Sequence, residues 1–239
     1  MVGAILLAAG SGKRMQGEME DKLLHPIGDS NAFKRSYEAF LQTDSIEWLV
    51  IVYKNDSQLS KLKVLCTEVN EQSPPARQRE MIWVKGGEER QDSVWAGLHA
   101  FPDKVTHVLV HDCARPFIRS TTIALMVAEV IQGRAVSVAR PLKDTLRLRT
   151  GPIVDPILPS ITRTIDRSNH WLMETPQGAP KDWFSDGFKK AREDGVFITD
   201  DMAVIELCAR PIGMIDPGYP NPKITTPEDF FYAEFLAQS

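Results

Sequence analysis

One stretch near the start of the chain decides the fold: VGAILLAAGSGKRM, residues 2–15. Its first six residues are apolar without alternation, which is typical of a strand buried on both faces of a sheet. A glycine-rich turn and two cations follow at once. Glycines let the backbone approach a ligand, and N–H groups with basic side chains suit a polyphosphate. Since nucleotides bind after parallel strands in open α/β sheets, the stretch predicts a nucleotide site in an α/β fold.

The loop differs from the two best-known phosphate-binding motifs. A P-loop would need glycine in place of Leu7 and serine or threonine in place of Arg14, and a dinucleotide-binding loop would need glycine in place of Met15. Glycine-rich turns are common in proteins of every kind. The loop alone therefore leaves an ordinary turn open as the alternative.

Strands and helices alternate along most of the chain. Apolar runs at 47–53 and 105–110 predict strands, and helical spacing of apolar residues at 33–41 and 121–131 predicts helices. Alternation of this kind is typical of a mostly parallel, twisted sheet with helices on both faces.

The alternation stops at about residues 142–173. This segment contains a Gly-Pro turn at 151–152 and a β-branched run at 161–165, the pattern of a hairpin. A lone hairpin buries too little to be stable by itself. We therefore expect a projecting β-arm that finds a partner, and a homodimer built through it.

Composition limits the classes of partner. The chain has 239 residues, 43% of them hydrophobic and 25% charged, with a net charge of -4 that argues against a nucleic-acid partner. The three cysteines are widely spaced and show neither a disulfide framework nor a zinc motif, so we expect a cytoplasmic protein. No apolar run is long enough to predict a membrane span.

Two more motifs follow predicted strands. GGEERQDS, residues 86–93, is a turn entering a helix, where Gly87 allows close approach and Ser93 offers a hydroxyl near free N–H groups. VHDCARP, residues 110–116, puts an aspartate and an arginine at a strand's carboxyl end. Asp112 could hold Mg²⁺ or a ribose hydroxyl there, and Arg115 could pair with phosphate. A capped turn and a surface ion pair are the alternatives.

The remaining motifs are short. They are Asp144-Thr145, Asp166-Arg167, Thr175-Pro176-Gln177, Thr199-Asp200 and NPKITTPED at 221–229. Thr199 also suits the N-cap of a helix, and the threonines before Pro227 suit the N-cap of the last one.

Taken in order, the motifs resemble the 2-C-methyl-D-erythritol 4-phosphate cytidylyltransferase family of the non-mevalonate isoprenoid pathway. The resemblance spans nearly the whole chain, and although each motif is weak alone, the ordered set is specific. It implies one Rossmann-like nucleotidyltransferase domain over residues 1–239 with a dimerising β-arm. It also implies transfer of the cytidylyl group from CTP to the sugar-alcohol phosphate, with Mg²⁺ as the cofactor.

The resemblance also implies residue roles. Arg14 and Lys22 would stabilise charge on the α-phosphate and the departing pyrophosphate, and Lys223 with Arg167 from the partner's arm would fix the acceptor phosphate. Asp112 and Arg115 would contact sugar and phosphate, and Asp112 is the one candidate offered for the metal, whose protein ligands stay undetermined. The other substrate-binding candidates are Ala8, Ala9, Gly10, Gly12, Gly87, Glu88, Ser93, Thr145, Thr175 and Thr199.

The chain departs from the family pattern in a few places. Asp21 and Leu23 flank Lys22 where the family usually has proline and glutamine, Arg140 replaces a small residue, and Gly178 follows Gln177 where an aromatic residue is usual. None of these changes removes a charged group from the predicted site.

Two other functions stay open at this point. A ribitol-5-phosphate cytidylyltransferase would share the fold and most of the cations. A non-catalytic nucleotide-binding subunit on the same fold belongs to a different class, although such proteins usually lose the cations that are retained here.

Overall fold

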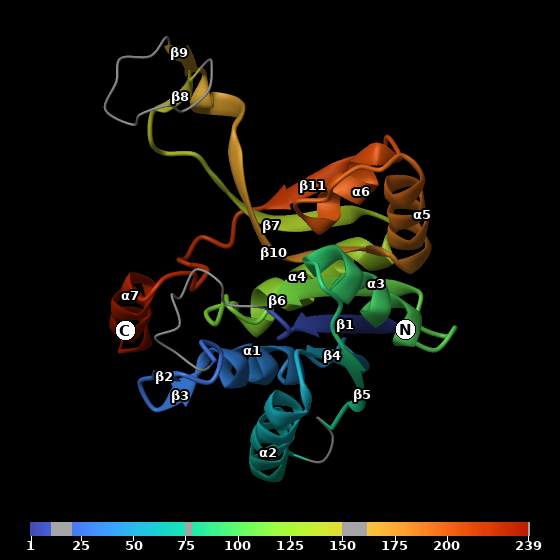
Figure 1. Cartoon of the computed structure of the whole chain (residues 1–239), viewed down its shortest axis with the longest axis vertical. Helices are drawn as coiled ribbons and strands as arrows, with labels where there is room; N and C mark the ends of the chain where they lie inside the picture. The colour runs from blue at the N-terminus through green and yellow to red at the C-terminus, as the bar shows by residue number, and fades with distance from the viewer. Residues whose placement is uncertain (11–20, 75–77, 150–161, 239) are drawn as a thin grey trace.

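The computed structural model describes residues 1–10, 21–74, 78–149 and 162–238. Within these residues, seven strands form one sheet in the order β11-β7-β10-β6-β1-β4-β5, which runs through the middle of the molecule (Figure 1). The strands are β1 (Val2–Leu7), β2 (Pro26–Ile27), β3 (Ser30–Asn31), β4 (Trp48–Tyr53), β5 (Glu80–Lys85), β6 (His107–Asp112), β7 (Ala135–Pro141), β8 (Leu146–Arg149), β9 (Thr162–Ile165), β10 (Trp171–Pro180) and β11 (Ile212–Ile215). The helices are α1 (Ala32–Leu41), α2 (Asp56–Gln72), α3 (Arg90–Ala100), α4 (Ser120–Ile131), α5 (Lys181–Glu193), α6 (Asp201–Leu207) and α7 (Glu228–Ala237), with a 3-10 turn, η3 (Arg167–Asn169).

The strand directions confirm the predicted, mostly parallel α/β fold. Neighbouring strands from β6 through β1 and β4 to β5 are parallel, as are β7 and β11, whereas β10 runs antiparallel to both β6 and β7. The chain leaves β1 toward β4 and β5, then returns to the other side of β1 at β6. Such a reversal opens a crevice at the carboxyl ends of the strands, which is where ligands bind in open α/β sheets.

Strand β1 is buried on both faces, which explains its apolar run. Ala4 and Leu6 belong to one hydrophobic cluster, and Ile5 and Leu7 belong to a second cluster on the other face of the sheet. Side chains alternate between the faces of a strand, so a strand covered by helices on both sides needs apolar residues at every position.

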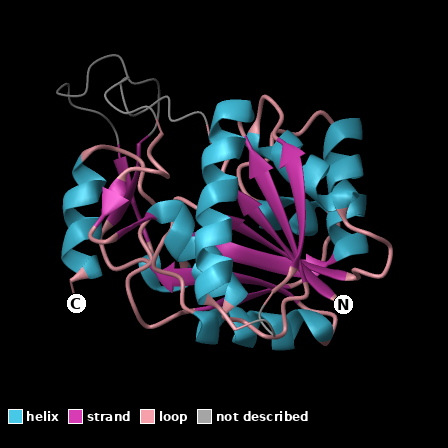
Figure 2. Cartoon of the chain, turned by 90° about the horizontal axis from the view of Figure 1, so that it is seen from below, coloured by secondary structure: helices cyan, strands magenta, loops and turns pink. Residues whose placement is uncertain are grey.

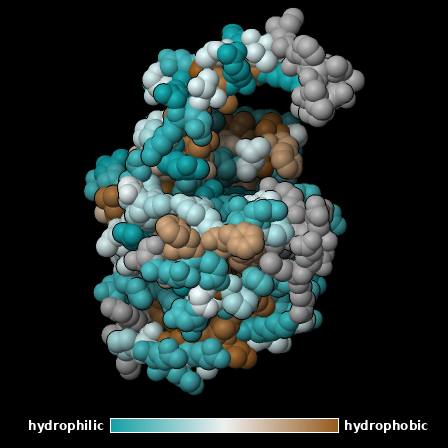
Figure 3. Space-filling model, turned by 90° about the vertical axis from the view of Figure 1, so that its left-hand side faces the viewer, coloured by the Kyte–Doolittle hydropathy of each residue, from teal (hydrophilic) through white to brown (hydrophobic). Residues whose placement is uncertain are grey.

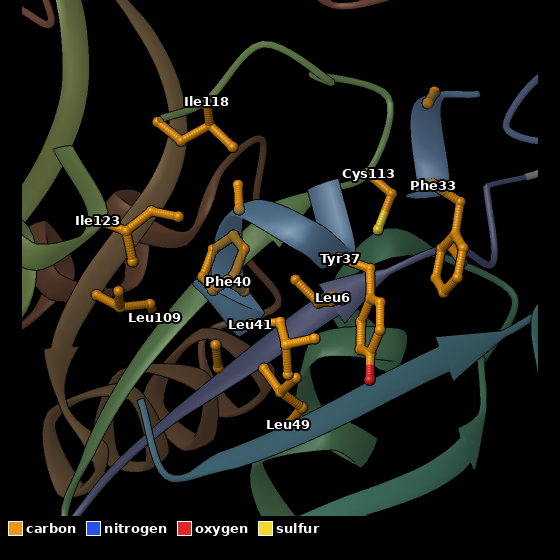
Figure 4. Close-up of a cluster of buried hydrophobic side chains, with 14 of the residues drawn as sticks. Leu6, Phe33, Tyr37, Phe40, Leu41, Leu49, Leu109, Cys113, Ile118 and Ile123 are labelled. Carbon is orange, nitrogen blue, oxygen red and sulfur yellow. The ribbon is translucent and has the colours of Figure 1, made fainter. Parts of the chain in front are cut away.

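Helices cover both faces of the sheet (Figure 2). The cluster that contains Leu6 takes its other members largely from α1, α2, α4 and α7, and the cluster that contains Ile5 takes them largely from α3, α5 and α6. Figure 4 shows the rings of Phe33, Tyr37 and Phe40, all from α1, directed toward the strands. Among the residues that the structure describes, no helix is long and apolar enough to cross a membrane.

The helix caps correct two predictions. Asn31 caps α1, and its side chain accepts a hydrogen bond from the N–H of Lys34 at 2.9 Å. Thr199, by contrast, is exposed and does not cap α6, because Asp200 occupies that position and accepts from the N–H of Ala203. The last helix has Pro227 at its cap with no capping side chain.

The predicted arm contains a hairpin whose strands, β8 and β9, pair from Leu146↔Ile165 to Arg149↔Thr162. The described part of the hairpin stands away from the sheet in Figure 1, and Figure 3 shows it projecting from the top of the molecule. The last predicted arm residues, 171–173, already pair with β7 in the main sheet. The part of the arm at 150–161 lies outside the described residues.

Gly187 lets helices α5 and α6 approach closely. A Cβ at this position would meet the backbone carbonyl oxygen of Val204 and lie 2.8 Å from both its carbonyl carbon and its Cβ. Backbone atoms cannot rotate away as a flexible side chain can.

We therefore expect Gly187→Ala to lower the free energy of unfolding by about 1–3 kcal/mol through overpacking, although alanine favours a helix by about 1 kcal/mol over glycine. Urea denaturation measures this change. Lys189→Ala, an exposed substitution on the same helix, is the matched control. An unfolding midpoint for Gly187→Ala at or above that of the wild type contradicts the close packing of the two helices.

Candidate active site

A cavity of about 570 Å³ opens at the carboxyl ends of the four parallel strands β1, β4, β5 and β6. This is the place where the sheet topology predicts a ligand site. The lining residues come from the segments that follow these strands, from the turn at Lys22 and from the segment before α7. They are Leu7, Ala9, Gly10, Lys22, Leu23, Lys54, Gly87, Glu88, Glu89, Arg90, Ser93, Asp112, Ala114, Lys223 and Thr225.

Half of the residues predicted for the site line this cavity. They are Ala9, Gly10, Lys22, Gly87, Glu88, Ser93, Asp112 and Lys223. Ala8 is buried just behind it, with its carbonyl oxygen 3.0 Å from the side-chain amide of Gln58. Gly12 and Arg14 lie outside the described residues.

The two glycines before α3 have a steric purpose. A Cβ at Gly86 would lie 2.5 Å from the Cβ of Ala9, so glycine lets the loop after β5 pack against the loop after β1. The N–H of Gly87 donates to Oγ of Ser93 at 3.2 Å, which tightens the turn at the start of α3. The N-terminus of α3 thereby borders the cavity, where its free N–H groups and dipole favour an anion.

A chain of alternating charges crosses the floor of the site. Asp112 accepts from Nε of Arg90 at 3.1 Å and also accepts from Nζ of Lys223. The other end of the Arg90 guanidinium forms two bonds, of 2.8 and 2.7 Å, with the carboxylate of Asp201, which is 0% exposed. Two forked bonds fix a planar guanidinium in orientation as well as in place.

Asp112 is held as a carboxylate by these cations. Burial alone raises its pKa, but the Arg90 guanidinium and the Lys223 ammonium outweigh burial and hold the pKa well below its usual range. Burial likewise lowers the pKa of Arg90, and Asp201 and Asp112 reverse that effect and raise it above its usual value. Asp112 and Arg90 therefore stay charged at neutral pH. Burial raises the pKa of Asp201, and the Arg90 guanidinium opposes that rise.

Thr175 supports Asp112 from behind. Its Oγ1 accepts from the N–H of Asp112 at 3.0 Å and lies 3.1 Å from Nδ1 of the buried His111. Thr175 is itself buried and does not line the cavity.

Four other predicted residues also lie outside this lining. Arg115 donates to the carbonyl oxygen of Asn221 at 2.9 Å and lies 3.7 Å from Glu174, close to the base of the arm. Arg167 donates to the carbonyl oxygen of Lys143 in the arm. Thr145 and Thr199 are exposed.

Two cations at the cavity, Lys54 and Arg90, were not among the site residues predicted from the sequence. Each could have been found. Lys54 directly follows the apolar run at 47–53, so it had to lie at the same sheet edge as the glycine-rich loop. Arg90 is the arginine of GGEERQDS, within a motif that was recognised for its glycines and serine.

Comparison with known proteins finds similarity to one family along nearly the whole chain. The family model of 2-C-methyl-D-erythritol 4-phosphate cytidylyltransferase matches residues 2–239. A protein of that name from Prochlorococcus marinus is 33% identical over 96% of this chain and 95% of its own length. Another of that name, from Geobacillus kaustophilus, is 34% identical over 99% and 96%.

The chain belongs to the 2-C-methyl-D-erythritol 4-phosphate cytidylyltransferase family.

Solved structures agree on the fold. A 4-diphosphocytidyl-2C-methyl-D-erythritol synthase from Anaerococcus prevotii superposes with a TM-score of 0.80 at 24% identity, covering 100% of this chain and 96% of that one. The 2-C-methyl-D-erythritol 4-phosphate cytidylyltransferase from Thermus thermophilus gives a TM-score of 0.74 at 23% identity, covering both chains completely. The Rossmann-like architecture predicted from the motifs is thus confirmed.

The donors at this cytidylyltransferase-family cavity do not form a metal cage of their own. Across the described ranges, no group of three or more histidine, cysteine, aspartate or glutamate side chains could hold a metal ion. Asp112 can offer at most one carboxylate, and both of its oxygens already accept from cations. This set fits Mg²⁺ only where phosphate oxygens of a ligand supply most of the coordination, as is usual for Mg²⁺ with nucleotides.

The buried His111 should make the stability of the fold depend on pH. It is fully buried between Phe40 and Thr175, and burial lowers its pKa to about 3. In the unfolded chain the imidazole titrates near 6.5, so between these values the unfolded state binds the extra proton, and stability falls as the pH falls. From about pH 6 to about pH 4, this group should cost about 1.4 kcal/mol of stability per pH unit.

Urea denaturation of wild type and His111→Asn across this range measures the effect. The variant should show the smaller slope of stability against pH, and His170→Asn, which changes an exposed histidine, should keep the wild-type slope. Equal slopes in wild type and His111→Asn would show that His111 does not stay neutral in the folded protein.

Proposed function

We propose that this protein transfers the cytidylyl group of CTP to 2-C-methyl-D-erythritol 4-phosphate, releasing pyrophosphate and forming 4-diphosphocytidyl-2-C-methyl-D-erythritol. Its relatives carry this activity in their names. The observation that carries the proposal is the convergence of Lys22 and Lys223, from opposite ends of the chain, on one cavity at the topological switch point of the sheet.

The reaction needs charge stabilisation more than it needs a base. A phosphate oxygen of the acceptor is already anionic at neutral pH, so it can attack the α-phosphorus of CTP without losing a proton. As the new P–O bond forms, the bond between the α-phosphorus and the oxygen that bridges the α- and β-phosphates breaks, and pyrophosphate leaves. The obstacle is repulsion between two anions, which fixed cations offset in phosphoryl transfer generally.

Lys22 and Lys223 are held for this task by different partners. Nζ of Lys22 donates to the carbonyl oxygen of Ile224 at 2.8 Å, which keeps the Lys22 ammonium next to the backbone of Lys223. Lys223 is itself fixed by Asp112. We assign Lys22, together with Arg14, to the α-phosphate and the departing pyrophosphate, and Lys223 to the acceptor phosphate.

The start of α3 and the loop after β1 frame the cytidine in this proposal. Their contribution comes largely from backbone groups and from Oγ of Ser93. A pocket closed by backbone leaves less room for a purine base and so favours the smaller pyrimidine. The residues assigned to this frame are Ala8, Ala9, Gly10, Gly12, Gly87, Glu88 and Ser93.

We propose that Mg²⁺ arrives on the triphosphate of CTP, as part of the nucleotide substrate, with Asp112 as the carboxylate of this site that would contact it. The ion would supply further neutralisation of phosphate charge. The chain's own residues hold the reactants: Asp112 orients Lys223, and Arg115 and Thr175 support the adjoining acceptor region.

The arm completes the site in trans in this proposal. Arg167 and Thr145 lie on the arm and not at the cavity of their own chain, so a homodimer in which each arm reaches the partner's cavity gives both residues a substrate to bind. Thr199 adds a hydroxyl on the same chain. We further propose that the enzyme works in the cytoplasm, in keeping with its three free cysteines.

Product analysis tests the function directly. The protein is incubated with CTP, Mg²⁺ and either 2-C-methyl-D-erythritol 4-phosphate or ribitol 5-phosphate, and the products are identified by mass spectrometry. The cytidine diphosphate adduct of the first acceptor should dominate. A preference for ribitol 5-phosphate, or CTP binding without any product, contradicts the proposal.

Lys22→Ala should lower kcat by about 10²–10³, the scale of losing one charge-stabilising donor in a preorganised site. Pyrophosphate release, measured with a coupled assay at saturating substrates, reports kcat. Lys189→Ala removes an exposed lysine far from the cavity and should keep wild-type turnover. A folded Lys22→Ala protein with near-wild-type kcat refutes the assigned role.

Arg167→Ala should weaken use of the phospho-sugar while CTP affinity, measured by calorimetry, stays unchanged. Because Arg167 would act across the dimer, mixing Arg167→Ala with Lys223→Ala subunits should restore activity. Random mixing leaves one intact site in each mixed dimer, so about a quarter of wild-type activity is expected.

Two outcomes oppose this arrangement. Mixtures no more active than the separate variants would show that Arg167 does not act in trans. A monomeric mass by light scattering at micromolar concentration would exclude the homodimer.

A further inference from the structure

Asp21 organises the turn that carries Lys22. Its carbonyl oxygen accepts from the N–H of Leu24 at 3.1 Å, and its Oδ1 accepts from the N–H of Leu23 at 3.0 Å. Lys22 lies inside this turn, so two hydrogen bonds to one residue fix the backbone on its far side.

The second carboxylate oxygen of Asp21 anchors the turn to the body of the protein. Oδ2 accepts from Nε2 of Gln58 at 2.6 Å, and Gln58 is only 5% exposed at the first turn of α2. The backbone N–H of Gln58 is capped in turn by Asn55 at 2.9 Å. The anchor is thus a buried, fixed side chain.

The amide of Gln58 joins three segments of the cavity wall. Oε1 accepts from the N–H of Lys54 at 2.7 Å, which assigns Nε2 as the donor to both Ala8, at 3.0 Å, and Asp21. Ala8 directly follows β1, and Lys54 directly follows β4. One amide therefore fixes the positions of these two strand ends relative to the turn that carries Lys22.

Leu23 contributes apolar contact at the same place. It is 3% exposed in the cluster that contains Leu6, and its carbonyl oxygen accepts from the N–H of Phe33 at 3.1 Å. The turn is thereby held by polar contacts on the Asp21 side and by the core on the Leu23 side. The Lys22 side chain between them reaches the carbonyl oxygen of Ile224.

We propose that Asp21 and Gln58 are positioning residues for the reaction, which hold the Lys22 ammonium at the nucleotide cavity. This inference rests on the proposed function, because it assigns Lys22 a role in charge stabilisation. Asp21 closes the turn by hydrogen bonds, and Gln58 ties that turn to the ends of β1 and β4. Neither side chain touches the reacting atoms.

A double-mutant cycle with Lys22 tests the inference. Asp21→Asn keeps the size of the side chain, but its single oxygen can no longer serve both Leu23 and Gln58. It should lower kcat about 10-fold to 100-fold, since a displacement of about 1 Å can cost about 100-fold. In the Lys22→Ala background the same substitution should change kcat by less than about two-fold, because residues that act through one another are not additive.

Gln58→Met gives a second route to the same test, because it keeps the length of the side chain and removes the amide. Its effect should shrink in the Lys22→Ala background, and the remainder reflects the contacts of the same amide with Ala8 and Lys54. Asp29→Asn is the matched control, since Asp29 has a 97% exposed carboxylate and should leave kcat unchanged in both backgrounds. Thermal unfolding of each variant checks that the protein is folded.

The same cycle is measured in CTP binding by calorimetry, which needs no turnover. Asp21→Asn should weaken CTP binding about ten-fold in the wild-type background and leave it unchanged in Lys22→Ala. Absence of product with wild-type protein would overturn the proposed function, while the binding cycle would still decide this inference. Equal effects of Asp21→Asn with and without Lys22, or no effect of either variant, overturn the positioning role.

Discussion

The site depends on one buried ion, the carboxylate of Asp112. It lies at the last residue of β6 and meets Arg90 on one side and Lys223 on the other, while Asp201 holds Arg90 from below. Each charge in this chain is compensated by its neighbour, and removal of one member would leave an unpaired charge in a poorly solvated place. The arrangement brings together four separate segments of the sequence, and it sets the direction from which Lys223 reaches the cavity.

The sheet explains why that carboxylate lies where it does. Leu7 at the end of β1 pairs with Asp112 at the end of β6, and these two strands flank the point where the strand order reverses. Parallel strands bring their carboxyl ends to one edge, so the loops that follow them share a cavity without any long insertion. The hydrophobic clusters on the two faces hold this edge, since β1 contributes to both of them.

Local patterns in the sequence were enough for the strand at Val2–Leu7 and for the alternation of strands and helices, and together with the family resemblance they predicted about half of the cavity's lining. Strand β10 was missed because it holds two prolines and a glycine, yet it runs between β6 and β7 in the sheet. The partnership of Arg90 with Asp201 was also missed, since it depends on the first residues of α3 and α6, 111 positions apart in the sequence, meeting in space. The surroundings that Arg167 would have in the proposed homodimer depend on a second copy of the chain, which a single sequence does not display.

Strand β10 has a consequence for how this molecule would respond to assembly. It begins at Trp171, shortly after the projecting hairpin. Its fifth residue, Thr175, accepts a hydrogen bond from the backbone N–H of Asp112. The hairpin that would contact a second copy of the chain is therefore followed closely by the strand that holds Asp112. In the proposed dimer, a shift of the chain at the root of the hairpin would therefore reach the residue that supports Asp112.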